Sequence, residues 1–336
     1  MTRRKYFELR HGVAYTRRVT WRGDGMALCK RFLGLLLCVS AVMLADASAA
    51  DARTRRNSHR RTTRHAPAPP AWLESRSAIV LDSRTGEALF ERQPDVHMYP
   101  ASTTKVLTAI VAIESGRLDE MVTVQPGDTQ VSPSSIQLRA GEKISLQDLV
   151  YGLLLRSGND AAMAIARHLG RGDRTRFYAM MNAKASEIGC TDSHFTNPHG
   201  LPDRNHYTTA RDLGRIMVYA MKNEEFRRVT GTQRYISNSS MRTRMMINKN
   251  KLLRTYPGTT GGKPGYTVAA QQTLVASARR SDRELVVVCL HSAGRALWSD
   301  AAHLLDFGFD KLGLRTSAAS VQTPERRAYA SLAGTP

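Results

Sequence analysis

The sequence predicts an α+β fold, in which an antiparallel sheet is flanked by helices and joined to an all-helical lobe. Two strand patterns, 77–82 and 88–91, flank a turn near the start of the predicted folded region. A long helical stretch follows, and two further strands, 272–279 and 285–291, come before a closing helix at 298–307. Because strands lie at both ends of a helical middle and do not alternate with helices, an α+β architecture is favoured over a parallel sheet.

Apolar spacing predicts the helices of the middle segment. After Pro100, apolar residues recur at helical intervals until Gly116. Ser145 is a suitable N-cap for a helix that ends at Ser157-Gly158, and an alanine-rich helix begins at Asn159. Helical spacing returns in two later segments, 174–188 and 208–221.

The first 49 residues are predicted to be a signal peptide. An apolar run of 13 residues, 32–44, is too short to span a bilayer comfortably but suits the core of a signal peptide. A Lys-Arg pair precedes it, and Ala47-Ser48-Ala49 provides a small-residue cleavage site. Counted from Met26, the segment has ordinary proportions, so we expect translation to start there. The mature chain is therefore expected in the periplasm or on the exterior of the cell envelope.

Three further segments are predicted after the signal peptide. Residues 50–71 contain six arginines and three prolines with little apolar content, which is typical of a disordered linker. This linker is either a solvated spacer or a segment attracted to the anionic envelope. Residues 72–314 are the predicted catalytic domain, and 315–336 are a predicted disordered tail.

The basic excess of the chain is concentrated outside the predicted folded domain. Lysine and arginine number 49 against 29 aspartates and glutamates, a formal net charge of +20. Residues 1–76 carry 16 of those cations and five of the anions, which accounts for 11 of the 20 charges. No nucleic-acid motif accompanies this excess, so we expect no nucleic-acid partner.

Cysteine usage leaves one pairing open. Two of the four cysteines fall in the predicted signal peptide, and Cys190 and Cys289 remain. An exported protein allows a disulfide between them, but two separate buried thiols fit the sequence equally well.

Three motifs in order indicate the chemistry. Ser102-Thr103-Thr104-Lys105 places a hydroxyl and an amine one helical turn apart, where the amine can act as the base that activates the serine. Ser157-Gly158-Asn159 and Lys263-Pro264-Gly265 follow. Taken singly, each fits an N-cap, a turn or a solvated loop lysine. Their order matches the three motifs of class A β-lactamases and penicillin-binding proteins, with departures at Gly158 and Pro264.

When the residues that flank the three motifs are included, the chain resembles the serine-type D-Ala-D-Ala carboxypeptidases, which are low-molecular-mass penicillin-binding proteins. The resemblance covers residues 73–310 and includes the stretches 99–105, 155–162, 194–201, 207–210, 248–253 and 262–267. It implies the β-lactamase/DD-peptidase-like fold and removal of the terminal D-alanine from peptidoglycan stem peptides. It also implies that β-lactam antibiotics act as acylating inhibitors.

The resemblance assigns a role to each motif residue. Ser102 would attack the carbonyl of the penultimate D-Ala, with Lys105 as its base, and Ser157 would relay a proton to the leaving amine. The base role requires a depressed pKa of Lys105, to which Lys263 would contribute.

Substrate-binding roles follow in the same way. Asn159, Lys263, Gly265 and Tyr266 would line the substrate site. Backbone N–H groups of Ser102 and Tyr266 would form the oxyanion hole.

Pro264 is the departure that bears on activity. The family has Thr or Ser at this position, and its hydroxyl helps to hold the terminal carboxylate of the substrate. Proline removes that hydroxyl and one backbone N–H, which an edge strand tolerates when the N–H faces away from the sheet. Loss of a charge-assisted hydrogen bond costs about 1.5–3 kcal/mol, so we expect carboxypeptidase activity to be weakened about 10- to 100-fold. Lys249 is a candidate partial substitute for the hydroxyl.

Three rival functions stay open at this stage. A β-lactamase of class A needs a glutamate that activates water, and no Glu-x-x-x-Asn segment lies between the second and third motifs. A DD-endopeptidase of the same fold is slightly favoured by Pro264, since a cross-link presents its carboxylate differently. A catalytically impaired penicillin- or cell-wall-peptide-binding protein is supported only by Pro264.

No metal or other cofactor is predicted. His194, His199 and His206 are irregularly spaced and are interpreted as loop residues. The expected partners are peptidoglycan stem peptides and β-lactams.

Overall fold

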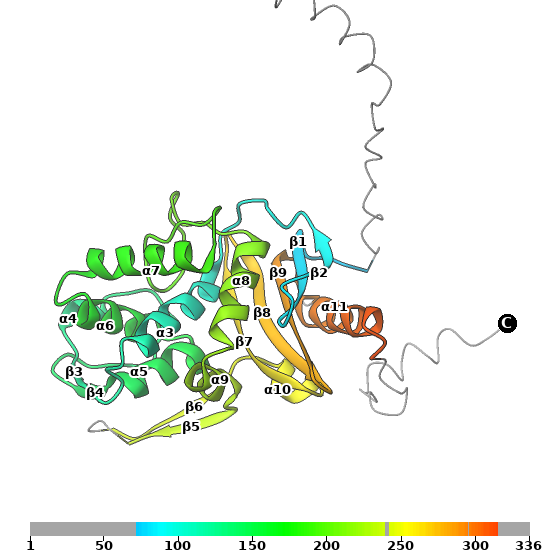
Figure 1. The fold of residues 1–336 in the computed structure, drawn as a ribbon. Coiled ribbons are helices and arrows are strands. Elements are labelled where there is room, and N and C mark those ends of the chain that lie inside the picture. The colour runs from blue at the N-terminus through cyan, green and yellow to red at the C-terminus, as the bar shows by residue number, and fades with distance from the viewer. Residues whose placement is uncertain (1–71, 239–241, 295, 315–336) are drawn as a thin grey trace, which may run out of the picture. The chain divides into compact units, whose positions relative to one another are not determined.

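The computed structural model describes residues 72–238, 242–294 and 296–314 (Figure 1). The predicted signal peptide, linker and tail lie outside these residues. Within the described ranges, no helix is long and apolar enough to cross a membrane. Cys190 and Cys289 are both free thiols, so the disulfide that the sequence allowed is not formed.

The central feature is a five-stranded antiparallel sheet with the order β2-β1-β9-β8-β7. Its strands are β1 (Ser77–Asp82), β2 (Ala88–Arg92), β7 (Thr259–Thr267), β8 (Gln271–Arg280) and β9 (Arg283–Ser292). The predicted strands at both ends of the chain therefore pair in one sheet, and β7, which carries the third motif, is an edge strand as expected.

Both faces of the sheet are covered by helices. Alternate residues of a strand point to opposite faces, so Ile79 packs into the core on one side and Val80 into the core on the other. Helix α8 (Ala210–Ala220) covers the first face, and helix α11 (Leu297–Lys311) covers the second (Figure 1). This burial on both faces explains why β9 reads as an almost continuous apolar run.

The second lobe is helical and surrounds α3 (Lys105–Glu114), whose first nine residues are all buried. Around it lie α4 (Pro126–Thr129), α5 (Leu146–Tyr151), the π-helical segment η3 (Gly152–Arg156), α6 (Asn159–Leu169) and α7 (Arg174–Ile188), together with the ribbon of β3 (Met121–Thr123) and β4 (Lys143–Ser145). Ser145 caps α5 as predicted, because its Oγ accepts a hydrogen bond from the backbone N–H of Asp148 at 3.1 Å.

The sequence did not reveal several short elements between α8 and β7. These are α9 (Glu224–Gly231), the hairpin of β5 (Arg234–Ser237) and β6 (Arg244–Ile247), and α10 (Leu252–Thr255). Each is too short to give a clear period, so local pattern does not distinguish it from a loop. The hairpin is held to the lobe through Asp148, which accepts hydrogen bonds from Tyr235 and Ser237 at 2.6 Å each.

We predict that Gly308→Val destabilises the fold by about 1–3 kcal/mol through overpacking. Even the first side-chain atom, a Cβ at this position of α11, would lie 2.7 Å from Leu285 Cδ1 and 2.9 Å from Val80 Cγ1. Urea unfolding would measure the change, with Asp310→Val at an exposed position of the same helix as control. Equal stability of the two variants would show that α11 does not approach the sheet this closely.

Candidate active site

Ser102 lies at the junction of sheet and helical lobe. It belongs to a 3₁₀ turn, η2 (Ala101–Thr104), that leads directly into α3. The Pro100 carbonyl oxygen fixes this turn by accepting hydrogen bonds from Thr103 Oγ1 at 2.7 Å and Thr273 Oγ1 of β8 at 3.0 Å. Ser102 itself is partly exposed, so its hydroxyl is accessible at the end of a rigid support.

Lys105 is fully buried below Ser102, and its amine meets three oxygen atoms. Nζ lies 2.9 Å from Ser102 Oγ, 2.7 Å from Asn159 Oδ1 and 2.6 Å from the carbonyl oxygen of His199. Burial holds the pKa of Lys105 well below its usual value, and the positive charges of Lys263 and Lys249 lower it further. The Asp160 carboxylate opposes that shift.

The second and third motifs meet on the other side of the site. Ser157 has left-handed backbone geometry, with φ of 66°, at the end of η3, and its side chain is directed at β7. Lys263 Nζ donates to Ser157 Oγ at 3.0 Å and to the Pro264 carbonyl at 2.8 Å. Lys263 is fully buried, and burial together with the charge of Lys249 lowers its pKa to about 7.

Gly265 allows β7 to approach the serine turn. A Cβ at this position would lie 2.7 Å from the backbone nitrogen of Ser102, 2.6 Å from Thr273 Oγ1 and 3.1 Å from the Ala101 Cβ. Any side chain here would therefore push the strand away from Ser102.

Because β7 is an edge strand, its backbone N–H groups alternate between facing β8 and facing away from the sheet. Pro264 has no N–H, so it suits the position of the ladder whose N–H would face away from β8. The N–H of Tyr266, two residues further, faces the same way because strand backbone groups alternate. The Tyr266 side chain is 56% exposed at the mouth of the site.

Asp160 orders the segment opposite β7, a role that the sequence did not indicate. Its buried carboxylate accepts hydrogen bonds from Ser135 Oγ at 2.6 Å and from the backbone N–H groups of Ile136 and Leu138 at 3.0–3.1 Å. Within the same segment, Asn159 Nδ2 donates to the Ser132 carbonyl at 2.7 Å, and Lys249 Nζ donates to Ser134 Oγ at 2.9 Å.

The three histidines lie in loops as predicted, but the sequence did not indicate the buried position of His206. All three lie between helices, but His206 is fully buried behind the serine turn. Its Nδ1 accepts from the Thr196 N–H at 3.0 Å, so the proton is on Nε2, which donates to Thr104 Oγ1 at 2.9 Å. Burial is the main cause that lowers the pKa of His206 to about 4, so the ring is neutral at pH 7.

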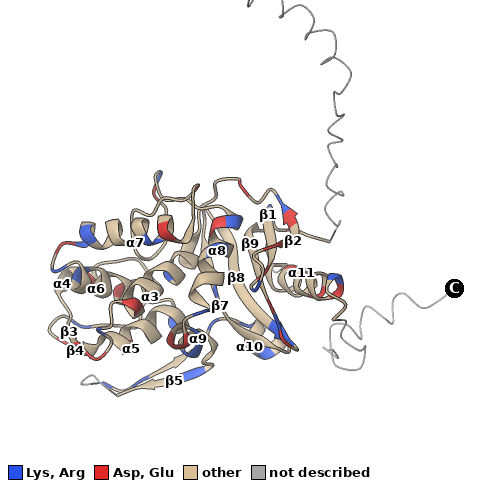
Figure 2. Cartoon of the chain, in the orientation of Figure 1, with Lys and Arg blue, Asp and Glu red and all other residues tan. Residues whose placement is uncertain are grey.

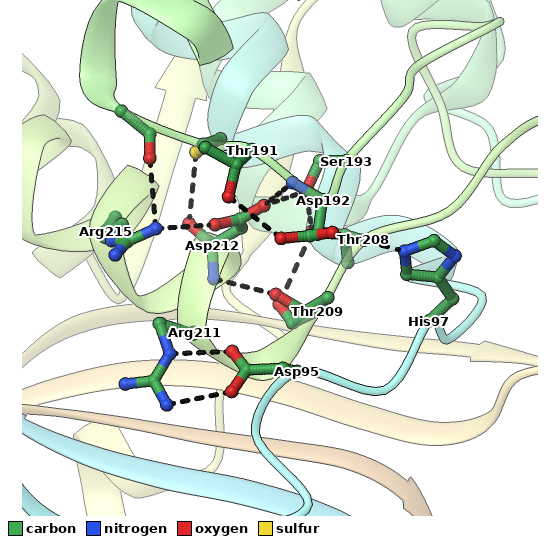
Figure 3. A network of polar contacts seen from close by, with 12 residues as sticks. Asp95, His97, Thr191, Asp192, Ser193, Thr208, Thr209, Arg211, Asp212 and Arg215 are labelled. Atoms are coloured by element: carbon green, nitrogen blue, oxygen red, sulfur yellow. Dashed lines mark hydrogen bonds and ion pairs between the residues drawn. The ribbon is translucent and has the colours of Figure 1, made fainter. Parts of the chain in front are cut away.

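The segment 190–209 carries the carbonyl of His199 and is tied to the fold by the network in Figure 3. The Asp212 carboxylate accepts from the Asp192 N–H and from Ser193 Oγ, and Ser193 Oγ also meets Thr208 Oγ1 at 2.8 Å. Thr208 in turn exchanges two backbone hydrogen bonds with Met98, four residues before Ser102. The network therefore fixes the chain just before the turn that carries Ser102.

Close packing adds to this fixation. A Cβ on Gly200 would lie 1.7 Å from the Ala101 carbonyl oxygen, so only glycine fits against the turn. Among the described residues, there is no group of three or more His, Cys, Asp or Glu side chains that could hold a metal ion.

All seven residues predicted from the sequence lie in this one region. Ser102, Lys105 and Asn159 are joined by hydrogen bonds, Ser157 and Lys263 form a second pair, and Gly265 contacts the turn. An α+β fold that presents Ser-x-x-Lys beside an edge strand with Lys-x-Gly defines the class of active-site serine enzymes that includes the penicillin-binding proteins.

Comparison with known proteins identifies the family within that class. The model of the D-alanyl-D-alanine carboxypeptidase family matches residues 62–294. D-alanyl-D-alanine carboxypeptidase DacB2 of Mycobacterium tuberculosis is 39% identical over 237 residues, which cover 69% of this chain and 81% of the relative. The chain therefore belongs to the D-alanyl-D-alanine carboxypeptidases, a family of serine peptidases.

Solved structures agree with this assignment. The Streptomyces K15 DD-transpeptidase is similar with a TM-score of 0.68 and 32% identity, covering 71% of this chain and 98% of that one. A D-alanyl-D-alanine carboxypeptidase from Mycobacterium tuberculosis H37Rv also has a TM-score of 0.68, with 36% identity over 73% of this chain and 94% of its own. The predicted family and fold are thus confirmed.

We predict that His206 makes the fold sensitive to acid. Its pKa is about 4 in the folded chain, whereas the usual pKa of histidine is 6.5, so between these values only the unfolded chain binds the proton. Stability should therefore fall as the pH drops from 7 towards 4, with a loss of about 2 kcal/mol from this residue at pH 5.

Urea unfolding of the parent and of His206→Gln at pH 7 and pH 5 would measure this. Glutamine can accept from Thr196 and donate to Thr104 but does not titrate. The loss between pH 7 and pH 5 should be about 2 kcal/mol smaller in the variant. An identical loss in both proteins would show that His206 is not held neutral.

Proposed function

We propose that this enzyme is an exported DD-carboxypeptidase that removes the terminal D-alanine of peptidoglycan stem peptides through an acyl-enzyme on Ser102. One observation carries the proposal: a buried lysine amine, with its pKa held low, lies 2.9 Å from the hydroxyl of the accessible Ser102. A neutral amine at that distance can accept the serine proton, which is the requirement for a serine nucleophile.

Acylation transfers the peptide from D-alanine to Ser102. Ser102 Oγ bonds to the carbonyl carbon of the penultimate D-Ala as its proton passes to Lys105 Nζ. The N–H groups of Ser102 and Tyr266 stabilise the oxyanion, a contribution of about 3–4 kcal/mol for each such donor. When the C–N bond breaks, the proton held by Lys105 passes through Ser157 Oγ to the leaving amine, so that Lys105 is neutral again and free D-alanine departs.

Deacylation repeats the proton transfer with water. Lys105, neutral again, accepts a proton from water as the hydroxide bonds to the acyl carbon, and Ser102 leaves with a proton returned from Lys105. The short contacts of Lys105 with Asn159 and the His199 carbonyl support this role, because they hold the amine against Ser102 in both half-reactions.

We assign recognition of the substrate carboxylate to two lysines, Lys263 of β7 and Lys249. Lys263 supplies positive potential there but is already engaged with Ser157 and the Pro264 carbonyl. Lys249 Nζ donates a hydrogen bond to Ser134 Oγ, and its positive charge lowers the pKa of Lys263. With no hydroxyl at residue 264, we propose that these lysines hold the carboxylate less tightly, which weakens the carboxypeptidase activity.

Pro264 also supports a second candidate, a DD-endopeptidase of the same fold. A site that makes fewer contacts with a free terminal carboxylate discriminates less against a cross-linked peptide. Comparison of D-Ala release from a stem pentapeptide with cleavage of a cross-linked dimer separates the two functions, since the ratio of kcat/KM values decides which reaction the site prefers.

Incubation of the full chain with a labelled penicillin, followed by peptide mass spectrometry, tests the acyl-enzyme. A stable adduct on Ser102 that is absent in Ser102→Ala supports the proposal. Rapid hydrolysis without an adduct would instead favour a β-lactamase, and neither adduct nor hydrolysis would favour a binding protein.

We predict that Pro264→Thr raises kcat/KM for release of D-Ala from a stem pentapeptide about 10- to 100-fold. The restored hydroxyl would add one charge-assisted hydrogen bond of about 1.5–3 kcal/mol to the substrate carboxylate. The matched control is Pro257→Thr in the exposed segment before β7, which should leave the rate unchanged. An unchanged rate in Pro264→Thr contradicts the weakening attributed to this proline.

We also predict that Lys249→Gln moves the acid limb of the acylation profile to higher pH. The charge of Lys249 lowers the pKa of both Lys105 and Lys263, so its removal raises both. A Coulomb interaction of about 0.7 kcal/mol corresponds to a shift of about half a pH unit.

The measurement is the rate of penicillin acylation between pH 5 and 9. Lys251→Gln is the control, because that lysine lies over the Trp298 ring, away from the two buried amines. A profile of Lys249→Gln that coincides with that of the parent would mean that Lys249 does not tune the base.

A further inference from the structure

The outer face of the β5–β6 hairpin is apolar and exposed. Ile236 and Met245 are direct cross-strand neighbours and are 51% and 59% exposed, and Ile247, two residues along β6, is 42% exposed. Their neighbours in the strands, Ser237 and Met246, point inward and are buried, so the three apolar side chains share one outward face. We call Ile236, Met245 and Ile247 the hairpin face.

Positive charge surrounds the hairpin face. Arg234 is exposed and lies directly opposite Ile247 in the ladder. Lys249 follows Ile247 by two residues, and the charge of Arg156 lies close enough to Lys249 to lower its pKa. Within the described ranges, none of these three cations forms an ion pair with a carboxylate.

The sequence around the hairpin face contains no acidic residue. Residues 226–281 hold 11 lysines and arginines and no aspartate or glutamate. In Figure 2 the hairpin accordingly carries blue but no red segments. Two carboxylates, Asp148 and Glu142, do contact the hairpin, but both are buried and bound by its inward-facing side chains. An exposed apolar group beside exposed cations, with the nearby carboxylates buried, favours the interface of an anionic bilayer, where apolar side chains insert and cations meet headgroups.

We propose that the hairpin face docks on an anionic phospholipid bilayer. The apolar side chains enter the boundary between headgroups and acyl chains, and Arg234 and Arg156 meet the phosphates. A soluble anionic polymer would satisfy the cations but leave Ile236, Met245 and Ile247 in water, so the apolar half of the surface favours a bilayer. Because Lys249 also reaches Ser134 of the candidate site, docking places the mouth of that site close to the membrane.

Site-specific fluorescence quenching in the full chain tests this inference. A tryptophan introduced by Met245→Trp reports the hairpin face, and Met180→Trp, at an exposed methionine of α7, is the matched control. Helix α7 lies on the opposite side of the lobe from the hairpin in Figure 1. Vesicles contain phosphatidylglycerol and phosphatidylcholine with brominated acyl chains, and the signal of the parent chain corrects for its native tryptophans.

The expected result is quenching of the Met245→Trp signal that exceeds that of Met180→Trp at least about threefold. Replacing phosphatidylglycerol by phosphatidylcholine should remove most of it, and adding Ile236→Ser with Ile247→Ser should do the same. Release of D-Ala from a soluble peptide should be unchanged in all these variants.

Two results would overturn the proposal. Equal quenching at residues 245 and 180 would show that the hairpin face does not enter the bilayer, whichever other segment binds the vesicles. Equal quenching in anionic and neutral vesicles would show that the cations play no part. In the first case, binding of soluble polyphosphate through Arg234 and Arg156 would show that the surface recognises an anionic polymer instead.

Discussion

The candidate site depends on one lysine amine that has no contact with solvent. Lys105 lies at the start of α3, the helix at the centre of the lobe, and it is as deeply buried as the apolar residues that follow it. A charged amine in such a place is costly, and the nearby cations add to that cost. The fold therefore favours the neutral amine, which is the state that the proposed mechanism needs.

The oxygen atoms around Lys105 come from three separate parts of the chain, and the rest of the fold serves to hold them together. Ser102 is supplied by the serine turn, Asn159 by α6, and the carbonyl of His199 by the segment that Asp212 ties down. The edge strand β7 closes the arrangement, because Gly265 lets its backbone approach Ser102. Loss of any one support would leave a buried amine with an unsatisfied position, which links stability of the lobe to competence of the site.

The sequence predicted the parts of the site that are local or that match a motif. Ser102 and Lys105 are three residues apart, so helical geometry alone brings them together, and the strands around β8 and β9 are long and apolar enough to recognise. The roles of His206 and Asp160 were not predicted, because their partners lie 102 and up to 25 residues away, and nothing local marks them as buried. The β5–β6 hairpin was missed because four-residue strands carry little periodicity.

The low pKa of the buried Lys105 amine is tested most directly by titration of the enzyme labelled with ¹³C at the ε carbon of lysine. Comparison with Lys105→Arg and Lys263→Arg would assign the two buried resonances. The Lys105 resonance should titrate well below the usual lysine pKa of 10.5, and the Lys263 resonance should titrate near pH 7. A Lys105 resonance that stays in its protonated position up to about pH 10 would show that no neutral base faces Ser102.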